Sequence, residues 1–345
     1  MSIVLSDPVY VPREASSFVE RGLLRIIRDK RDLPFLGLMA FLAATVVPSG
    51  VVLFVPGVLD SRFGWWIAAL HLGLVVYMLG PFILMLHNTS HRALFKHGWG
   101  SANLVIPWLL GPFFGESPET YFAHHVGMHH LENNLADDLS TTLPYRRDSF
   151  AGFMRYFLRF FFIGLIELSA YFARKRRRTL MWRCILGELS FFALCGVLWH
   201  FNPRATLVVF IAPFVIARFG MMAGNWGQHA FVDRDAPENN YRNSITCINA
   251  AYNRRCFNDG YHISHHLKAT RHWTEHPKEF TDNLASYATE RAIVFEGIDF
   301  FGVWFCLMLK RYDWLAKRLV PLGDTPLSTE QAIALMRSRT QWSRT

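Results

Sequence analysis

The stretch "PFLGLMAFLAATVVPSGVVLFVPGVL" occupies residues 34–59, and "GWWIAALHLGLVVYMLGPFILML" follows it at 64–86. Both stretches are apolar over a length that can cross a bilayer, which takes about 20 residues as a helix. The short connector "DSRFG" joins them. The pair is therefore predicted to form a transmembrane hairpin.

A second pair of apolar stretches has the same arrangement. Residues 184–199 read "CILGELSFFALCGVLW", residues 205–224 read "ATLVVFIAPFVIARFGMMAG", and "HFNPR" connects them. The sequence thus predicts four transmembrane helices arranged as two hairpins. Residues 150–173 are also apolar, but Arg155 and Arg159 favour a helix that lies in the membrane interface.

The basic residues predict the orientation of these hairpins. The chain has 36 Lys and Arg against 27 Asp and Glu. Arg62 and Arg204 lie in the two connectors and Arg218 lies within the fourth apolar stretch, which leaves 36 − 3 = 33 in the other segments. By the positive-inside rule those segments, with both termini, are cytoplasmic, in a multi-pass integral membrane protein. This distribution accounts for the basic charge, so no nucleic-acid partner is expected.

Histidines gather in the segments predicted to be cytoplasmic. They form "HNTSH" at 87–91, "HHVGMHH" at 124–130, "NWGQH" at 225–229 and "HISHH" at 262–266. Residues four apart share one face of a helix, as His87 and His91 do. Adjacent histidines such as His129 and His130 face different directions and can therefore bind two different metals. The predicted fold is all-α, with the membrane hairpins covered by a cytoplasmic helical cap that holds a histidine-rich di-metal site.

The composition of these segments narrows the chemistry. Neutral imidazole binds Fe, Zn, Cu and Ni, and the HExxH pattern of zinc hydrolases is absent from the sequence. Two irons with imidazole ligands can bind and cleave O2. The membrane location suggests an apolar substrate that reaches the site from the bilayer. The residues therefore predict a di-metal oxidase of an apolar molecule.

The order HxxxH, HxxxHH and HxxHH, with Asn-xxx-His before the third of these boxes, resembles the membrane fatty acid desaturase family over roughly residues 34–285. The resemblance implies a non-haem di-iron centre with two Fe ions and O2 as co-substrate. It implies a fatty acyl or membrane-lipid substrate that gains a double bond. It also implies electrons from a separate donor, either cytochrome b5 or a ferredoxin with its reductase.

Carried over box by box, the resemblance assigns nine histidines as iron ligands: His87, His91, His125, His129, His130, His229, His262, His265 and His266. Asn225 matches a position that reaches one iron through water. Asp137, Asp138 and Asp259 lie beside the boxes and are candidate acceptors for histidine N–H groups. His276 falls outside the four-residue spacing and is expected to be structural.

Alternatives stay open at this point. The second box has an additional His124, and "HHVGMHH" and "NWGQHAF" are also similar to alkane monooxygenase boxes, which favours hydroxylation of an alkyl chain as the alternative reaction. A metal transporter is a third possibility, but transport ligands line the bilayer interior.

The predicted organisation is a cytoplasmic arm at 1–33, the membrane domain at 34–285 and a C-terminal helical region at 286–345. "STEQ" at 328–331 is a capping-box pattern, which predicts a helix in the last of these regions.

Overall fold

The structure is a computed structural model that describes residues 3–15, 17–323 and 326–341. It divides into two compact units, each built from several segments of the chain. The helical unit comprises Val11–Val126 and Leu168–Phe219, and the mixed unit comprises Met1–Tyr10, Gly127–Glu167 and Gly220–Thr345. The predicted boundaries after residues 33 and 285 stay a prediction.

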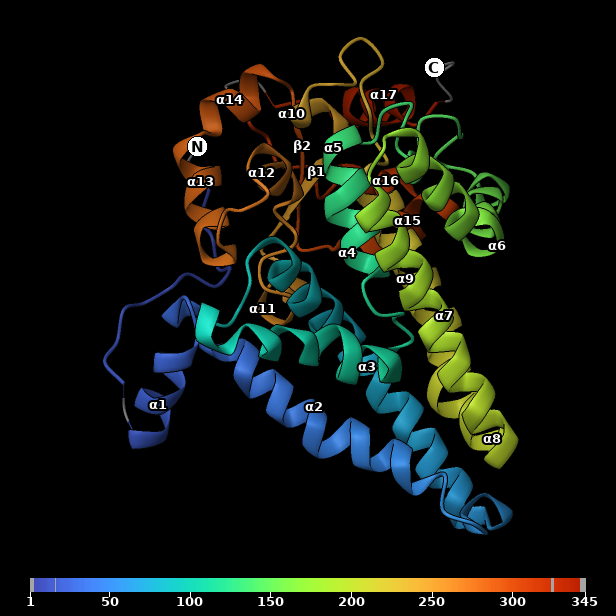
Figure 1. Cartoon of the computed structure of the whole chain (residues 1–345). Coiled ribbons are helices and arrows are strands. Elements are labelled where there is room, and N and C mark those ends of the chain that lie inside the picture. The colour runs from blue at the N-terminus through green and yellow to red at the C-terminus, as the bar shows by residue number, and fades with distance from the viewer. Residues whose placement is uncertain (1–2, 16, 324–325, 342–345) are drawn as a thin grey trace. The chain divides into compact units, whose positions relative to one another are not determined.

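The helical unit contains the long helices α2 (Leu33–Val52), α3 (Arg62–His91) and α7 (Arg178–Phe201) (Figure 1). Two further long helices, α6 (Phe150–Arg174) and α9 (Ala212–Gln228), contribute residues to both units. Short helical elements complete this unit: α1 (Phe18–Ile26), η1 (Lys30–Asp32), η2 (Val58–Asp60), η3 (His97–Leu104), η4 (Val105–Leu110), η5 (Gly111–Phe114), α4 (Thr120–His124), α8 (Pro203–Thr206) and η7 (Leu207–Ile211).

The first hairpin forms as its sequence predicts. The Ser61 side chain accepts a hydrogen bond from the backbone N–H of Gly64 and so caps α3. Gly64 is required there because a Cβ would collide with the Val58 carbonyl. The two connectors lie together: Arg204 Nη2 is 2.5 Å from Asp60 Oδ1, and Arg204 Nη1 donates to the Leu59 carbonyl. The tips of both predicted hairpins are therefore neighbours within this unit.

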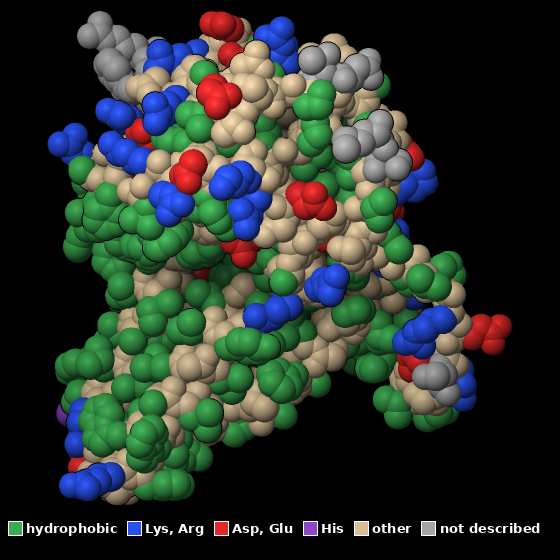
Figure 2. Space-filling view, turned by 180° about the vertical axis from the view of Figure 1, so that it is seen from behind, with side chains coloured by type: hydrophobic (Ala, Val, Ile, Leu, Met, Phe, Trp, Pro, Cys, Tyr) green, Lys and Arg blue, Asp and Glu red, His purple; other side chains and the backbone are tan. Residues whose placement is uncertain are grey.

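Five helical stretches have the length and composition to cross a membrane: Lys30–Val52, Arg62–His91, Phe150–Arg174, Arg178–Phe201 and Pro203–Gln228. Their outward side chains include large exposed apolar groups such as Trp66, Leu70 and Phe192. In the lower part of the view in Figure 2, hydrophobic side chains are gathered with few charged groups among them. These helices indicate a membrane protein. Four spans, with α6 in the interface, stay a prediction because α6 also meets the length and composition requirement.

The mixed unit holds the remaining elements: η6 (His125–His129), which begins in the helical unit, α5 (His130–Glu132), α10 (Asn240–Asn243), β1 (Ile245–Ile248), α11 (Ala251–Arg255), α12 (His262–Leu267), η8 (Trp273–Glu275), α13 (His276–Asp282), α14 (Leu284–Thr289), β2 (Ile293–Glu296), α15 (Phe300–Met308), α16 (Tyr312–Ala316) and α17 (Thr329–Arg339). The predicted capping box at Ser328 and Gln331 is confirmed at the start of α17.

A short sheet is the exception to the expected all-helical fold. Strand β1 pairs in parallel with β2, with Ile245 opposite Ile293 and Cys247 opposite Phe295. Both strands have four residues, of which three are apolar, and periodicity cannot distinguish such short runs from buried helix. The sheet lies in the core of the mixed unit, and in the sequence its two strands flank the segment that carries "HISHH".

Candidate metal centre

Three histidines converge in the helical unit. His87 and His91 lie one turn apart at the C-terminal end of α3, and His125 follows α4. The Nε2 atoms of His91 and His125 are 3.1 Å apart, and the ring centroids of His87 and His125 are 4.5 Å apart. Each ring offers one nitrogen within 4.8 Å of the others. His87, His91 and His125 are called the first cluster below.

Close packing and ion pairs position the two elements that carry this cluster. Arg92, directly after α3, donates to Asp29 at 2.9 Å. Glu119, directly before α4, adopts a left-handed conformation (φ 67°) and forms an ion pair with Arg183 of α7. Gly187 of α7 lies so close to the Pro118 carbonyl that a side chain could not be accommodated. The start of α4 is thereby fixed against α7.

Four histidines converge in the mixed unit, and these are called the second cluster: His129, His229, His262 and His266. One ring nitrogen of each lies within 4.8 Å of the others. His262 Nε2 lies 3.2 Å from His229 Nε2 and 3.0 Å from His266 Nε2. These ligand atoms come from three separate boxes, which the mixed unit brings to one point.

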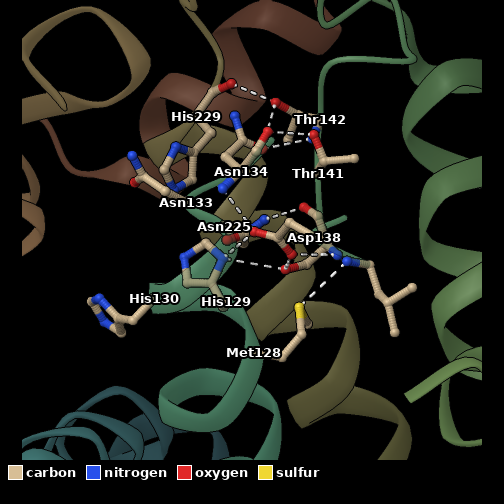
Figure 3. A network of polar contacts seen from close by, with 12 residues as sticks. Met128, His129, His130, Asn133, Asn134, Asp138, Thr141, Thr142, Asn225 and His229 are labelled. Atoms are coloured by element: carbon tan, nitrogen blue, oxygen red, sulfur yellow. Dashed lines mark hydrogen bonds and ion pairs between the residues drawn. The ribbon is translucent and has the colours of Figure 1, made fainter. Parts of the chain in front are cut away.

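Two of these rings have a fixed orientation (Figure 3). His129 Nδ1 is 2.7 Å from Asp138 Oδ2, and His229 Nδ1 is 2.9 Å from the Asn243 carbonyl oxygen. Carboxylate and carbonyl oxygens only accept hydrogen bonds, so each Nδ1 carries the proton. Each Nε2 therefore presents a lone pair to the cluster, as a metal ligand requires.

The surroundings keep two imidazoles of the second cluster, those of His229 and His266, neutral. Burial, followed by the neighbouring His129, lowers the pKa of His229 to about 4. Burial and the surrounding imidazoles lower the pKa of His266 well below its usual value. Since a metal binds only the deprotonated nitrogen, the second cluster needs no proton release from these two rings at neutral pH.

The last two of the nine predicted ligands, His130 and His265, form a pair. His130 Nε2 and His265 Nε2 are 2.8 Å apart in the mixed unit. In Figure 3 the His130 ring is turned away from Asp138, whereas the His129 ring faces it. Adjacent histidines therefore point to different places, as the sequence predicts: His129 and His266 belong to the second cluster, and His130 and His265 to the pair.

The donor sets fit a transition metal. Nitrogens bound to one ion at about 2.0–2.1 Å lie roughly 3 Å from one another, which is the spacing of the Nε2 atoms in both clusters. The ligands are imidazoles, which suit Fe, Zn, Cu and Ni. The buried rings and the fixed tautomers of His129 and His229 add the pre-organisation that such a site needs.

The other predicted residues have particular contacts. Asn225 Nδ2 donates to Tyr156 Oη at 2.7 Å and to the Ser140 carbonyl. Of the three candidate aspartates, Asp138 contacts a box histidine, whereas Asp259 accepts from Tyr252 at 2.7 Å. Burial raises the pKa of Asp259 to about 7. His276 lies outside both clusters and bonds Ser264 Oγ through Nδ1, as expected for a structural histidine.

The sequence analysis did not predict a polar network inside the helical unit. Arg218 of α9 donates to Glu188 of α7 at 2.6 Å, and Ser117 Oγ donates to the same carboxylate oxygen at 2.5 Å. Arg218 also donates to Ser117 Oγ at 3.0 Å. Glu188 and Arg218 both lie within stretches that can span a membrane. Opposite charges in the two apolar stretches were the available signal, because buried charges in a membrane pair with one another.

Long apolar helices together with buried histidine clusters define the class of helical membrane proteins with histidine-lined metal sites. A sequence model of this class, described as fatty acid desaturase, matches residues 63–296. The chain belongs to the fatty acid desaturase family, which confirms the resemblance seen in its boxes and implies an oxidoreductase. No curated protein and no solved structure matches the chain.

Proposed function

We propose that this protein is a membrane-bound, iron-dependent oxidoreductase that uses O2 to introduce a double bond into a fatty acyl chain. The observation that carries the proposal is the convergence of the box histidines into two all-imidazole clusters in a member of the fatty acid desaturase family. We assign one iron to each cluster, with the His130–His265 pair as further ligands.

Iron supplies the activation of O2 when it is bound. The residues of the chain hold the ligands in place: Asp138 and the Asn243 carbonyl fix two Nδ1–H groups, and burial keeps the rings of His229 and His266 neutral. The overall reaction removes two hydrogens from adjacent carbons of the acyl chain. O2 is reduced to two water molecules with two further electrons and two protons.

The electrons require a separate donor, for which we propose cytochrome b5 or a ferredoxin with its reductase. The substrate is proposed to be an acyl chain or a membrane lipid that reaches the site from the bilayer. The apolar helices of the helical unit support this route because they offer an extensive apolar surface to lipid. We further propose that both termini and the boxes are cytoplasmic.

The test is mass spectrometry of total lipids from a host that expresses the protein. His262→Ala removes a member of the second cluster, and His97→Ala removes an exposed histidine outside both clusters. We expect new unsaturated chains with the wild type and with His97→Ala, and their loss with His262→Ala. An unsaturated product that persists in His262→Ala at the wild-type level would contradict the proposal.

Hydroxylation of an alkyl chain is the second candidate, because the second box and "NWGQHAF" are similar to alkane monooxygenase boxes. The two reactions begin with the same hydrogen abstraction but differ in the fate of oxygen. Expression under ¹⁸O2 separates them: a desaturase leaves the label in water, whereas a hydroxylase transfers one labelled atom to the lipid.

A further inference from the structure

A buried arginine joins three distant segments of the mixed unit. Arg147 is fully buried, and among the described residues its guanidinium donates to backbone carbonyls. The acceptors are Ala230 at 3.0 Å, Thr142 at 3.2 Å, Leu143 at 3.5 Å, Tyr145 at 3.3 Å, Arg339 at 2.8 Å and Gln341 at 2.9 Å. All three guanidinium nitrogens are used, in directions set by the planar fork.

These carbonyls lie in three parts of the chain. Thr142 and Tyr145 belong to the loop after the second box, Ala230 directly follows His229, and Arg339 and Gln341 lie at the end of α17. The backbone of Arg147 adds two bonds, since its N–H donates to the Thr340 carbonyl and its carbonyl accepts from Trp226 Nε1, both at 2.9 Å.

The loop that Arg147 holds is the one that orients the second cluster. Thr142 Oγ1 donates to the His229 carbonyl at 2.7 Å, and the Thr142 N–H donates to Asn134 Oδ1 at 2.8 Å. The backbone N–H of Asn134 in turn donates to Asp138, the carboxylate that faces His129. Figure 3 shows this chain of contacts from Thr142 to His129. A displacement of the loop therefore moves the supports of two cluster histidines together.

The interaction is costly to break. Burial lowers the pKa of Arg147 to about 9, so the side chain is still charged at neutral pH. A buried guanidinium is stable only when its N–H groups are all bonded, and removing it leaves several buried carbonyls without a donor. Lysine cannot replace it fully, because a single ammonium group cannot reach carbonyls on three sides.

We infer that Arg147 is a positioning residue for the second cluster and that Arg339–Gln341 belong to the same metal-binding unit. The C-terminal segment therefore supports the second cluster indirectly. Its carbonyls bind Arg147, and Arg147 binds the loop that contains Thr142 and the Ala230 carbonyl next to His229. The inference rests on the proposed function only in taking each cluster to bind one metal.

The experiment counts iron per chain in the purified full-length protein by elemental analysis. We compare Arg147→Met and Arg147→Lys with Arg146→Met, because Arg146 is the adjacent arginine and its side chain is half-exposed. Two truncations form a second matched pair: a chain that ends at Ser338 loses the carbonyls that bind Arg147, whereas a chain that ends at Gln341 keeps them.

We expect Arg147→Met and the chain ending at Ser338 to retain the first-cluster iron and to bind the second about 10- to 100-fold more weakly, the usual effect of losing a group that supports metal ligands. Arg147→Lys is expected to be intermediate. Arg146→Met and the chain ending at Gln341 should keep both irons. Adding His262→Ala to Arg147→Met should change the count no further, while adding His91→Ala should remove the remaining iron.

Retention of both irons by Arg147→Met, or loss of both, would overturn the inference. Equal iron counts for the two truncations would overturn its C-terminal part. Hydrogen exchange of the backbone amides gives a readout that needs no metal. Residues 140–145 and 229–232 should exchange faster in Arg147→Met than in Arg146→Met. Equal exchange rates in the two variants would also overturn the inference. A protein that binds both irons but forms no lipid product would contradict the proposed function and leave this inference standing.

Discussion

Nδ1 of His129 lies 2.7 Å from Oδ2 of Asp138, and the carboxylate is itself held by the backbone N–H groups of Asn134 and Ser140 at 2.8 Å. Ser140 Oγ adds a further bond to Oδ1 at 2.7 Å. A carboxylate that accepts this many hydrogen bonds cannot rotate freely, so it fixes the ring as well as its tautomer. The second cluster is thus built on a support that the helix spacing of its histidines alone does not provide.

The first prediction concerns this support. Asp138→Asn removes the negative charge and places an amide among groups that donate hydrogen bonds, so the orientation of His129 is weakened. We expect the second-cluster metal to bind about 10- to 100-fold more weakly, measured by competition with a chelator. Asp137→Asn, an exposed neighbour, is the control. Equal affinity in both variants would show that Asp138 does not support the ligand.

The second prediction concerns metal removal. A ligand that binds only the folded state stabilises it, so a strong iron chelator should lower the unfolding temperature of the wild-type protein in detergent. A double variant with His91→Ala and His262→Ala lacks one member of each cluster and should show little further decrease with chelator. A chelator effect of the same size in both proteins would indicate metal bound elsewhere.

The third prediction concerns the Arg218–Glu188 pair. Arg218→Met leaves the buried Glu188 carboxylate without its positively charged partner, which costs about 3–5 kcal/mol of unfolding free energy. Adding Glu188→Leu removes the stranded charge, so the double variant should be more stable than Arg218→Met alone. The stabilities of the wild type, both single variants and the double variant are compared by thermal unfolding in detergent. A double variant that loses the sum of both single effects would show that the two residues do not act as a pair.

The fourth prediction is a pH dependence. Burial lowers the pKa of His276 from 6.5 to about 3. Below pH 6.5 the unfolded chain binds a proton at this residue, whereas the folded chain does not until about pH 3, so stability is lost as pH falls. Between pH 7 and pH 5 the contribution amounts to about 2 kcal/mol. His276→Asn should reduce the loss of stability over this interval by about that amount relative to the wild type; an unchanged pH profile would contradict the account.

The spacing of the histidines within each box and the first hairpin were predictable because both depend on local periodicity, whereas the boxes were brought together only by the resemblance to a known family. A four-residue spacing places His87 and His91 on one face whatever the rest of the chain does, and apolar stretches of sufficient length predict the long helices. The five stretches of suitable length include α6, so the number of spans is not decided by hydropathy.

The other features depend on contacts between residues far apart in the sequence. Arg147 reaches carbonyls 83 and 194 residues away, and Asn134 reaches Asn243 across 109 residues. The strands β1 and β2 have four residues each, three of them apolar, which is too few for a periodic pattern. Nothing in the local sequence around Arg147 distinguishes it from the exposed Arg146. The supports of the second cluster therefore emerge only from the folded structure.

The most direct test of the central claim is a single turnover with purified protein. The wild type, loaded with iron and placed in lipid nanodiscs of defined acyl composition, is chemically reduced and exposed to O2, and the lipids are analysed by mass spectrometry. The account predicts new double bonds that require both iron and O2 and that are absent with His262→Ala. Iron-loaded, reduced protein that consumes O2 without forming an unsaturated lipid would contradict it, and a hydroxylated lipid would establish the alternative reaction.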